Sequence, residues 1–295
     1  MIESSNDDNN NKGVNFLQWA LPKMGYRWDG FSNPREQVLK RIRERMAELE
    51  LSGGYAEYKS YLEEHPKEWE RLDKLCDVTI SKFFRDRKLW DFLREKILTE
   101  LVCYPSEEFK QNSEKVHIWS AGCCNGEEPY SVAMIYEQLK KSKLSEHSTY
   151  RRILILATDR NDEVLKRAQI GRYPPGSLKE LDADEIETFF EKSEYDHQER
   201  NDDEPFKIKS RLKEYIEFEK RDIRESLPEK TFDIIFCRNL VFTYFTEERQ
   251  KQFLKRLKPH LKVGGYLVLG SNEEIPEAAW LEPVSDTHPV LVKVK

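Results

Sequence analysis

Long apolar segments are absent from the sequence. No apolar run approaches the roughly 20 residues that a membrane-spanning helix needs. The residues from Met1 to Lys12 are polar and acidic, without the apolar centre of a secretory signal. We therefore expect a cytoplasmic protein without membrane insertion. The same polar composition predicts that residues 1–20 form a disordered tail.

Cysteine is also scarce, and its pattern argues against a disulfide framework. The five cysteines are odd in number and form no CxxC pair, and three of them lie in apolar or glycine-rich runs. Reduced thiols are therefore favoured. Cys123 and Cys124 are neighbours, but no nearby His or Cys completes a tetrahedral set, so no metal site is predicted.

An excess of positive charge is absent as well. The net charge is −6, so no overall positive field would attract phosphates, and we expect no nucleic-acid partner. The chain has 295 residues, of which 38% are hydrophobic, so it can bury a core and is long enough for two domains of ordinary size.

Helical periodicity dominates the first part of the chain. The segments that show it are residues 39–49, 55–63, 68–76 and 89–101. In the first segment, the apolar residues recur at spacings of three and four and form one stripe: Leu39, Ile42, Met46 and Leu49. We predict a helical N-terminal domain over residues 21–103 and a polar linker over residues 104–115.

The other face of the 39–49 helix is charged. It carries Lys40, Arg41, Arg43, Glu44, Arg45 and Glu48. These residues form either a solvated face with ion pairs at i,i+4 spacing or a basic docking surface for an acidic partner.

After residue 115, buried strands alternate with amphipathic helices. The predicted strands cover residues 116–119, 153–157, 232–237 and 266–269, and the predicted helices cover residues 127–139, 163–170 and 247–261. Continuous apolar strands between helices indicate a parallel sheet that is covered on both faces. We predict one α/β domain over residues 116–295.

One region interrupts this alternation. After a predicted helix at residues 182–191, polar and apolar residues alternate from Phe206 to Phe218, which predicts antiparallel β structure in an inserted subdomain at about residues 191–218. The polar positions form a basic strip of Lys207, Lys209, Arg211 and Lys213. The strip suits an acidic protein substrate, or it protects an exposed edge strand from aggregation.

The first strand of the α/β domain ends in a glycine-containing turn, Gly122 to Gly126, which leads into a helix. Such turns let the backbone approach a nucleotide at the carboxyl edge of a sheet. The sequence contains neither the G-x-G-x-x-G of dinucleotide sites nor the Gly-Lys-Ser/Thr of phosphate loops. Glu127 and Glu128 follow the turn, where they would repel a phosphate but attract a sulfonium and an amino group. This charge favours S-adenosylmethionine.

Two further acids extend the predicted nucleoside site. Asp159 ends the second strand, where a carboxylate can accept hydrogen bonds from both ribose hydroxyls. Its alternative role is to cap the following helix, which Asp162 could do equally well. Asp222 follows the strand at 215–218 and either reaches an adenine amino group or is a plain loop acid.

Several motifs, in order, resemble the CheR family of chemotaxis-receptor (protein-glutamate) O-methyltransferases. The strongest is residues 119–131 (WSAGCCNGEEPYS), and the others are residues 80–86 (ISKFFRD), 157–159 (ATD), 171–173 (GRY), 232–239 (FDIIFCRN), 264–265 (GG) and 269–273 (LGSNE). Together they cover about residues 35–275.

The resemblance implies a fold and a site. The fold is a Rossmann-like class I methyltransferase domain with a small all-helical N-terminal domain and an inserted antiparallel β-subdomain. By the resemblance, Glu128 holds the methionine end of the cofactor, Asp159 the ribose, and Asp222 with Ile223 the adenine. The remaining predicted cofactor residues are Thr79, Ser81, Arg85, Gly122, Asn239 and Leu240.

Arg85 and Tyr244 are the predicted catalytic residues. Arg85 would lie near the transferred methyl and orient the acceptor carboxylate; its alternative role is a salt bridge at the domain junction. The chain departs from the family pattern at three places. Ser81 stands for a Thr, Asp222 stands for an Asn, and residues 239–245 (NLVFTYF) are one residue longer than the family's N-x-x-I-Y-F.

The implied function is methyl transfer to glutamate side chains of an acidic protein substrate, the cytoplasmic helix of a chemoreceptor-like protein. In the family, the β-subdomain can also dock a receptor's C-terminal peptide. Two alternatives remain at this point: a methyltransferase with another protein or a small carboxylate as acceptor, and a sensor or scaffold that binds S-adenosylmethionine without turnover.

Overall fold

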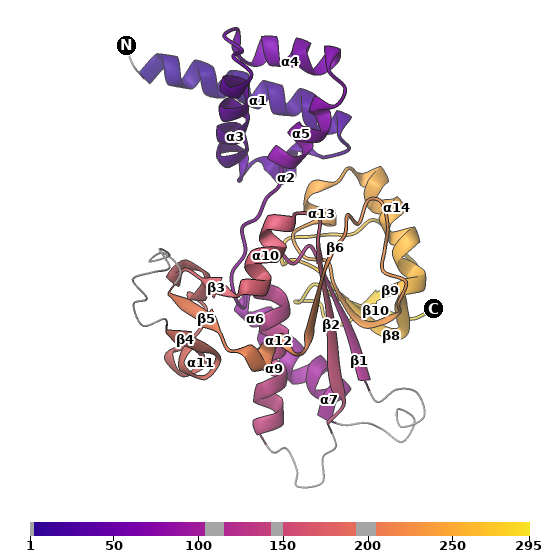
Figure 1. The fold of residues 1–295 in the computed structure, drawn as a ribbon. Coiled ribbons are helices and arrows are strands. Elements are labelled where there is room, and N and C mark those ends of the chain that lie inside the picture. The colour runs from indigo at the N-terminus through magenta and orange to yellow at the C-terminus, as the bar shows by residue number, and fades with distance from the viewer. Residues whose placement is uncertain (1–2, 104–114, 143–149, 193–204) are drawn as a thin grey trace. The chain divides into compact units, whose positions relative to one another are not determined.

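The computed structural model describes residues 3–103, 115–142, 150–192 and 205–295, and the chain forms two compact units (Figure 1). The first unit comprises Met1–Val78 and Leu240–Gln252, and the second comprises Thr79–Asn239 and Phe253–Lys295. The second unit begins at Thr79, whereas the predicted helical domain extends to residue 103. The predicted linker, except Lys115, lies outside the described residues.

The first unit is helical, as predicted. Its helices are α1 (Glu3–Lys23), α2 (Trp28–Phe31), α3 (Arg35–Glu48), α4 (Gly54–Glu64), α5 (Glu68–Leu75) and α13 (Val241–Tyr244). The predicted disordered tail at residues 1–20 is wrong, because α1 begins at Glu3. Phe16, Leu17 and Leu21 are buried, and the Phe16 ring lies 5.6 Å from that of Tyr58. This short apolar stripe orders a segment whose beginning is entirely polar.

The apolar stripe of α3 is confirmed, but its basic face is only partly free. Leu39, Ile42 and Met46 are buried. Arg45 donates from Nε and Nη2 to the two carboxylate oxygens of Glu68, both at 2.9 Å. Glu68 is itself buried and accepts a further bond from Tyr58. Arg45 therefore holds α3 against α5 and is not available as a docking charge.

The segment Leu240–Gln252 belongs to the helical unit, which the sequence did not predict. Arg27 binds the carbonyl oxygens of Phe242 and Thr243 at 2.6 and 2.9 Å. A Cβ atom on Gly30 would lie 2.2 Å from the Thr243 oxygen, so this close approach of α2 and α13 requires glycine. These contacts join residues more than 200 positions apart.

The second unit is built on a mostly parallel seven-stranded sheet (Figure 1). Its strands are β1 (Lys115–Ala121), β2 (Arg152–Asp159), β6 (Ile216–Lys220), β7 (Phe232–Phe236), β8 (Leu261–Val268), β9 (Leu281–Pro283) and β10 (Val290–Lys293). The order is β6-β2-β1-β7-β8-β10-β9, and only β10 runs antiparallel to its neighbours β8 and β9. The chain moves outward from β1 to β6 and then returns to β7, which creates a topological switch point between β1 and β7.

The helices that alternate with these strands along the chain are α6 (Arg87–Phe92), a π-helical segment (Leu93–Leu98), α7 (Thr99–Cys103), α9 (Glu127–Lys141), α10 (Asp162–Ile170), α11 (Ala183–Phe189), α12 (Ser210–Lys213) and α14 (Glu247–Leu257), with 3-10 turns at Pro175–Leu178 and Lys258–His260. Of these, α9 and α10 both contact β2 and β6. The chain passes from the first unit to the second within α14. The predicted helix 247–261 therefore ends before Leu261, which is the first residue of β8. Of the helices in the described ranges, none has both the length and the apolar content that a membrane crossing needs.

A small antiparallel sheet confirms the predicted β-subdomain, although its extent differs. It contains β3 (Arg172–Tyr173), β5 (Phe206–Ile208) and β4 (Phe190–Lys192), in that order. The prediction of antiparallel structure from 206 to 218 is wrong after Ile208. The chain there forms α12 and then β6, which pairs in parallel with β2.

The predicted basic strip does not exist as one face. Lys213 binds the carbonyl oxygens of Gln169 and Ile170 at the end of α10, at 2.7 and 2.9 Å. Lys209 and Arg211 bind the Thr188 carbonyl oxygen at the end of α11, at 3.0 and 2.6 Å. These cations satisfy the last carbonyls of two helices, where positive charge is favourable. Lys207 alone lies on β5.

Candidate active site

The predicted site residues of the second unit converge on the carboxyl ends of its central strands. Ala121, Asp159 and Phe236 end β1, β2 and β7. The glycine turn follows β1, and Arg238 and Asn239 follow β7. These positions flank the topological switch point, where open α/β sheets bind ligands.

The turn from Gly122 to Gly126 has the conformation that its glycines allow. Gly122 and Gly126 have φ angles of +75° and +89°. A Cβ atom on Gly126 would lie 3.0 Å from the Cβ of Ala168, so a side chain would meet both backbone strain and a close contact. The backbone amides of Gly122 and Cys123 bind the Thr158 carbonyl oxygen at 2.8 and 2.9 Å, which fixes the turn to the end of β2.

Asp159 is fixed beside this turn. Its Oδ2 accepts from the amide of Cys124 at 3.0 Å, and its Oδ1 accepts from the amide of Asn161 at 2.9 Å. The cap of α10 is Asn161, whose side chain accepts from the Glu163 amide. The alternative role of Asp159 as the helix cap is therefore wrong, and its partly exposed carboxylate remains suited to a ribose.

Glu128 lies at the first turn of α9, beneath the glycine turn. Its carboxylate accepts from the Ser120 hydroxyl at 2.6 Å and from Arg238 Nη1 at 3.4 Å. Burial raises the pKa of Glu128, while the positive charge of Arg238 acts in the opposite direction. The carboxylate is thus deep in the unit and depends on a buried arginine for its charge.

The neighbouring acid, Glu127, was not among the predicted site residues. It is 1% exposed, and burial raises the pKa of its carboxyl to about 7. Among the described residues, its Oε2 and the side-chain oxygen of Asn125 are buried atoms without a hydrogen-bond partner. Both acids follow the glycine turn in the sequence, and only the burial of Glu127 distinguishes it from the partly exposed Glu128.

The donor and acceptor balance of these residues fits S-adenosylmethionine. One buried side-chain oxygen of Asn125 and one of Glu127 accept no hydrogen bond from the described residues. Two more carboxylates lie nearby: Glu128 is the next residue in the chain, and Asp159 ends the neighbouring strand β2. Such a site suits a ligand that brings an ammonium group, hydroxyl groups and a positive sulfur, and it disfavours a phosphate.

The segment that carries Arg85 is anchored from both sides. The Phe83 amide donates to the Ser177 carbonyl oxygen, and the Phe84 amide donates to Ser131 Oγ on α9, both at 3.0 Å. Both phenylalanines are buried, whereas Thr79, Ser81 and Arg85 are partly exposed. Among the described residues of the second unit, the side chain of Arg85 makes one weak bond, from Nη1 to the Ile80 carbonyl oxygen at 3.3 Å, and forms no ion pair.

The predicted adenine residues lie in the loop after β6. Ile223 is buried, and Asp222 is partly buried. Burial tends to raise the pKa of Asp222, but the bonds from Arg224 Nε at 2.9 and 3.0 Å outweigh it and lower the pKa. Asp222 is therefore an ionised acceptor whose oxygens are shared with Arg224, which the sequence did not indicate.

Asn239 follows β7 in a left-handed conformation with a φ of +51°. Its backbone amide donates to Glu273 Oε2 at 2.8 Å, and the backbone amide of Gly270 donates to the same oxygen at 2.7 Å. Glu273 is buried and belongs to the late LGSNE motif. This motif therefore holds the backbone of Asn239 in its left-handed conformation.

Leu240 and Tyr244 belong to the first unit, unlike the other predicted site residues. The ring of Tyr244 meets that of Phe31 edge-on at 5.0 Å, and its carbonyl oxygen accepts from the Arg27 amide at 2.8 Å. The roles of Leu240 in cofactor binding and of Tyr244 in catalysis stay predictions.

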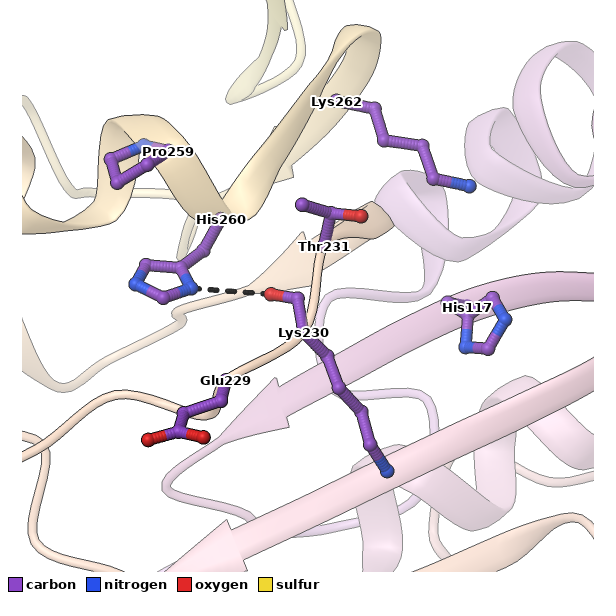
Figure 2. Close-up of a pocket in the computed structure, with 7 residues that line it drawn as sticks. All are labelled: His117, Glu229, Lys230, Thr231, Pro259, His260 and Lys262. Atoms are coloured by element: carbon purple, nitrogen blue, oxygen red, sulfur yellow. Dashed lines mark hydrogen bonds between the residues drawn. The ribbon is translucent and has the colours of Figure 1, made fainter. Parts of the chain in front are cut away.

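Figure 2 shows a pocket that is lined by residues at or just before the amino ends of central strands. His117 near the start of β1, Thr231 before β7 and Lys262 near the start of β8 line it. Lys262 Nζ donates to both oxygens of the buried Asp233 carboxylate, each at 2.9 Å. Because parallel strands share one direction, this pocket lies at their amino ends and takes no part in the candidate active site.

Comparison with known proteins identifies the family. The family model described as "CheR methyltransferase, SAM binding domain" matches residues 79–290, which is more than half of the chain. The protein belongs to the CheR methyltransferase family. Its cofactor is S-adenosylmethionine, and its second unit is a Rossmann-like class I methyltransferase domain, as the sequence predicted.

Relatives within the CheR family cover most of the chain. The "Chemotaxis protein methyltransferase" of Listeria monocytogenes is 32% identical over 222 residues, which are 75% of each chain. That of Borreliella burgdorferi is 32% identical over 226 residues, 75% of this chain and 74% of the relative. That of Escherichia coli is 27% identical over 243 residues, 81% of this chain and 76% of the relative.

The CheR assignment makes Asp159 a direct test of the cofactor site. We expect Asp159→Asn to weaken S-adenosylhomocysteine binding by about 10- to 100-fold, since each hydrogen bond to a charged group contributes about 1.5–3 kcal/mol. Asp162→Asn is the matched control, because Asp162 is exposed and pairs with Lys220. Titration calorimetry measures both. Equal affinities of the two variants would exclude Asp159 from the site.

Proposed function

We propose that this protein transfers a methyl group from S-adenosylmethionine to glutamate side chains of a chemoreceptor-like protein. Relatives named chemotaxis protein methyltransferases over three quarters of the chain support a receptor as the acceptor. The observation that carries the proposal is that Arg238 binds both Glu128 and the carbonyl oxygen of Arg85. The acid proposed to hold the cofactor and a partly exposed arginine are thereby linked at the carboxyl ends of the strands.

The reaction needs positioning more than proton transfer. When bound, the cofactor supplies a methyl group on a positively charged sulfur. A glutamate carboxylate is already ionised near neutral pH, so the acceptor needs no general base. Proximity and orientation contribute up to about 7–11 kcal/mol in favourable cases.

Each site residue then has a defined task. Glu128 holds the amino group of the cofactor, Asp159 its ribose, and Asp222 with Ile223 its adenine. Arg85 can bind the acceptor carboxylate with two parallel hydrogen bonds and leave one lone pair directed at the methyl group. The residues that complete the cofactor site are Thr79, Ser81, Gly122, Asn239 and Leu240, with Tyr244 as a second catalytic residue.

The acceptor in this proposal is an acidic cytoplasmic helix. On α3, Lys40 and Arg43 are exposed and remain candidates for contact with it, whereas Arg45 is engaged by Glu68. The β-subdomain offers weaker support for peptide docking. Three of its four predicted basic residues already donate to carbonyl oxygens at helix ends: Lys209, Arg211 and Lys213.

Transfer of a labelled methyl group tests the proposal. The protein is incubated with methyl-labelled S-adenosylmethionine and candidate receptors, and the label on the receptor is then treated with base. We expect base-labile label, since a carboxyl methyl ester hydrolyses readily. The control is a receptor in which the labelled glutamates are replaced by alanine, and it should remain unlabelled.

Three other outcomes would contradict the proposal in different ways. Base-stable label would indicate an acceptor other than a carboxylate. Label on a small carboxylate but on no receptor would favour another substrate class. Normal S-adenosylhomocysteine binding without transfer to any carboxylate would favour a sensor or scaffold.

A further inference from the structure

Arg238 is a buried cation at the centre of the candidate active site. It lies two residues after β7, and its side chain is 3% exposed. Nη2 donates to the Arg85 carbonyl oxygen and to Asp86 Oδ2, both at 2.8 Å, and Nη1 contacts Glu128 Oε2 at 3.4 Å. The guanidinium carbon lies 5.5 Å from the centre of the Trp90 ring. One side chain thus joins three separate segments of the second unit.

The segment that Arg238 binds has an unfavourable backbone conformation. Phe84 and Asp86 have φ angles of +48° and +66°, which are costly for residues with a side chain. Arg85 lies between them, and its carbonyl oxygen also accepts from Trp90 Nε1 at 2.9 Å. Such a turn persists only when its surroundings hold it. Arg238 supplies two of the bonds that do so.

We propose that Arg238 is a positioning residue that sets the distance between Glu128 and Arg85. This inference rests on the proposed function, in which Glu128 holds the amino end of the cofactor and Arg85 orients the acceptor. Arg238 touches neither ligand in this proposal. It acts by holding the carboxylate on one side and the backbone of the arginine turn on the other.

The contacts require arginine in particular. A guanidinium presents several N–H donors in a rigid plane, and it packs on an aromatic ring. A lysine ammonium at the same depth has the charge but not the reach to bind Arg85, Asp86 and Glu128 together. Glutamine can replace one hydrogen bond and removes the charge.

The charge on Glu128 gives a readout that a purely structural role would not change. The ionisable groups around it are Arg238 after β7, Arg85 and Asp86 in the arginine turn, Cys123 and Cys124 in the glycine turn, Glu127 on α9 and Asp159 at the end of β2. Burial raises the pKa of Glu128, and Arg238 is the first of the groups that lower it. Removal of Arg238 should therefore raise this pKa further.

The test compares Arg238→Gln and Arg238→Lys with the matched control Arg151→Gln. As whole residues, Arg151 and Arg238 are both 7% exposed, and Arg151 donates to the carbonyl oxygens of Leu101 and Lys115 at the amino end of the sheet. S-adenosylhomocysteine binding is measured by calorimetry from pH 5 to 9. In Arg238→Gln, the pH at which binding is half-maximal should rise by about one unit or more. In Arg238→Lys it should stay near that of the wild type.

Kinetics separate positioning from loss of the fold. At saturating cofactor, kcat should fall about 100-fold in Arg238→Gln, and Arg238→Lys should recover only part of it, because the turn is still misplaced. The positioning role is overturned if two results agree between Arg238→Gln and Arg151→Gln: the decrease in melting temperature and the pH profile of S-adenosylhomocysteine binding. The binding profile needs no acceptor. A wild type that fails to methylate receptors would therefore contradict the proposed function and leave this test intact.

Discussion

Replacement of Arg85 by alanine is expected to lower methyl transfer by about 100- to 1000-fold, the cost that removal of one transition-state contact typically has. Binding of S-adenosylhomocysteine should change far less. The reason is that the site holds Arg85 by its backbone. Its carbonyl oxygen is bound by Trp90 and Arg238, whereas its side chain makes a single bond of 3.3 Å to the Ile80 oxygen. Truncation therefore removes the guanidinium and leaves the turn in place.

Two further variants make the Arg85 experiment specific. Arg85→Lys keeps the charge but cannot bind a carboxylate through two parallel bonds, so it should recover only part of the lost rate. Lys88→Ala is the matched control, because Lys88 is an exposed cation on the adjoining helix α6. The measurements are kcat/KM for the receptor and calorimetric affinity for S-adenosylhomocysteine. Full activity of Arg85→Ala would remove Arg85 from the mechanism, and an equal loss of affinity would make it a cofactor ligand.

The elements that the sequence predicted well are those whose local pattern has one structural solution. The strand β7 is buried at every position from Phe232 to Phe236, so its apolar run could only be a core strand. The glycines of the 122–126 turn have positive φ angles that few other residues adopt. The acids Glu128 and Asp159 were predicted from their places beside these elements.

The elements that the sequence did not predict depend on contacts between distant segments. Residues 206–213 alternate like a strand, but Lys209 and Lys213 bind carbonyl oxygens at the ends of two helices. The segment from Leu240 belongs to the helical unit because Arg27 donates to its carbonyl oxygens and Gly30 lets its backbone approach closely. Arg238 lies in a quoted motif, yet its three partners come from positions 85, 86 and 128. Nothing local to these residues indicates their partners.

The buried acid Glu127 should make the stability of the second unit depend on pH. Its carboxyl has a pKa of about 7 in the folded protein against an ordinary value of 4.5, so the folded state binds this proton more tightly than the unfolded state does. The stabilisation is complete below about pH 4.5 and is lost as the pH rises through 7. The difference corresponds to about 3 kcal/mol.

Glu127→Gln is therefore expected to stabilise the protein at alkaline pH only. At pH 4 the carboxyl is neutral in the folded protein and mostly neutral in the unfolded chain, and glutamine has nearly its shape, so the free energy of unfolding should match that of the wild type. At pH 8.5 the variant should be more stable by up to about 3 kcal/mol, since it avoids a buried charge. Urea denaturation of both proteins across this pH range measures the difference.

Glu137→Gln on the same helix provides a control with the opposite trend. Burial tends to raise the pKa of Glu137, but Lys140 at 2.5 Å and Tyr215 outweigh it and lower the pKa. Its ionised form therefore stabilises the fold above about pH 4.5, and the variant should be less stable than the wild type at pH 8.5. A pH-independent difference for Glu127→Gln would contradict the buried charge. If the free oxygen of Glu127 accepts from the cofactor, saturating S-adenosylhomocysteine should narrow the gap at pH 8.5, because the ligand then compensates the charge.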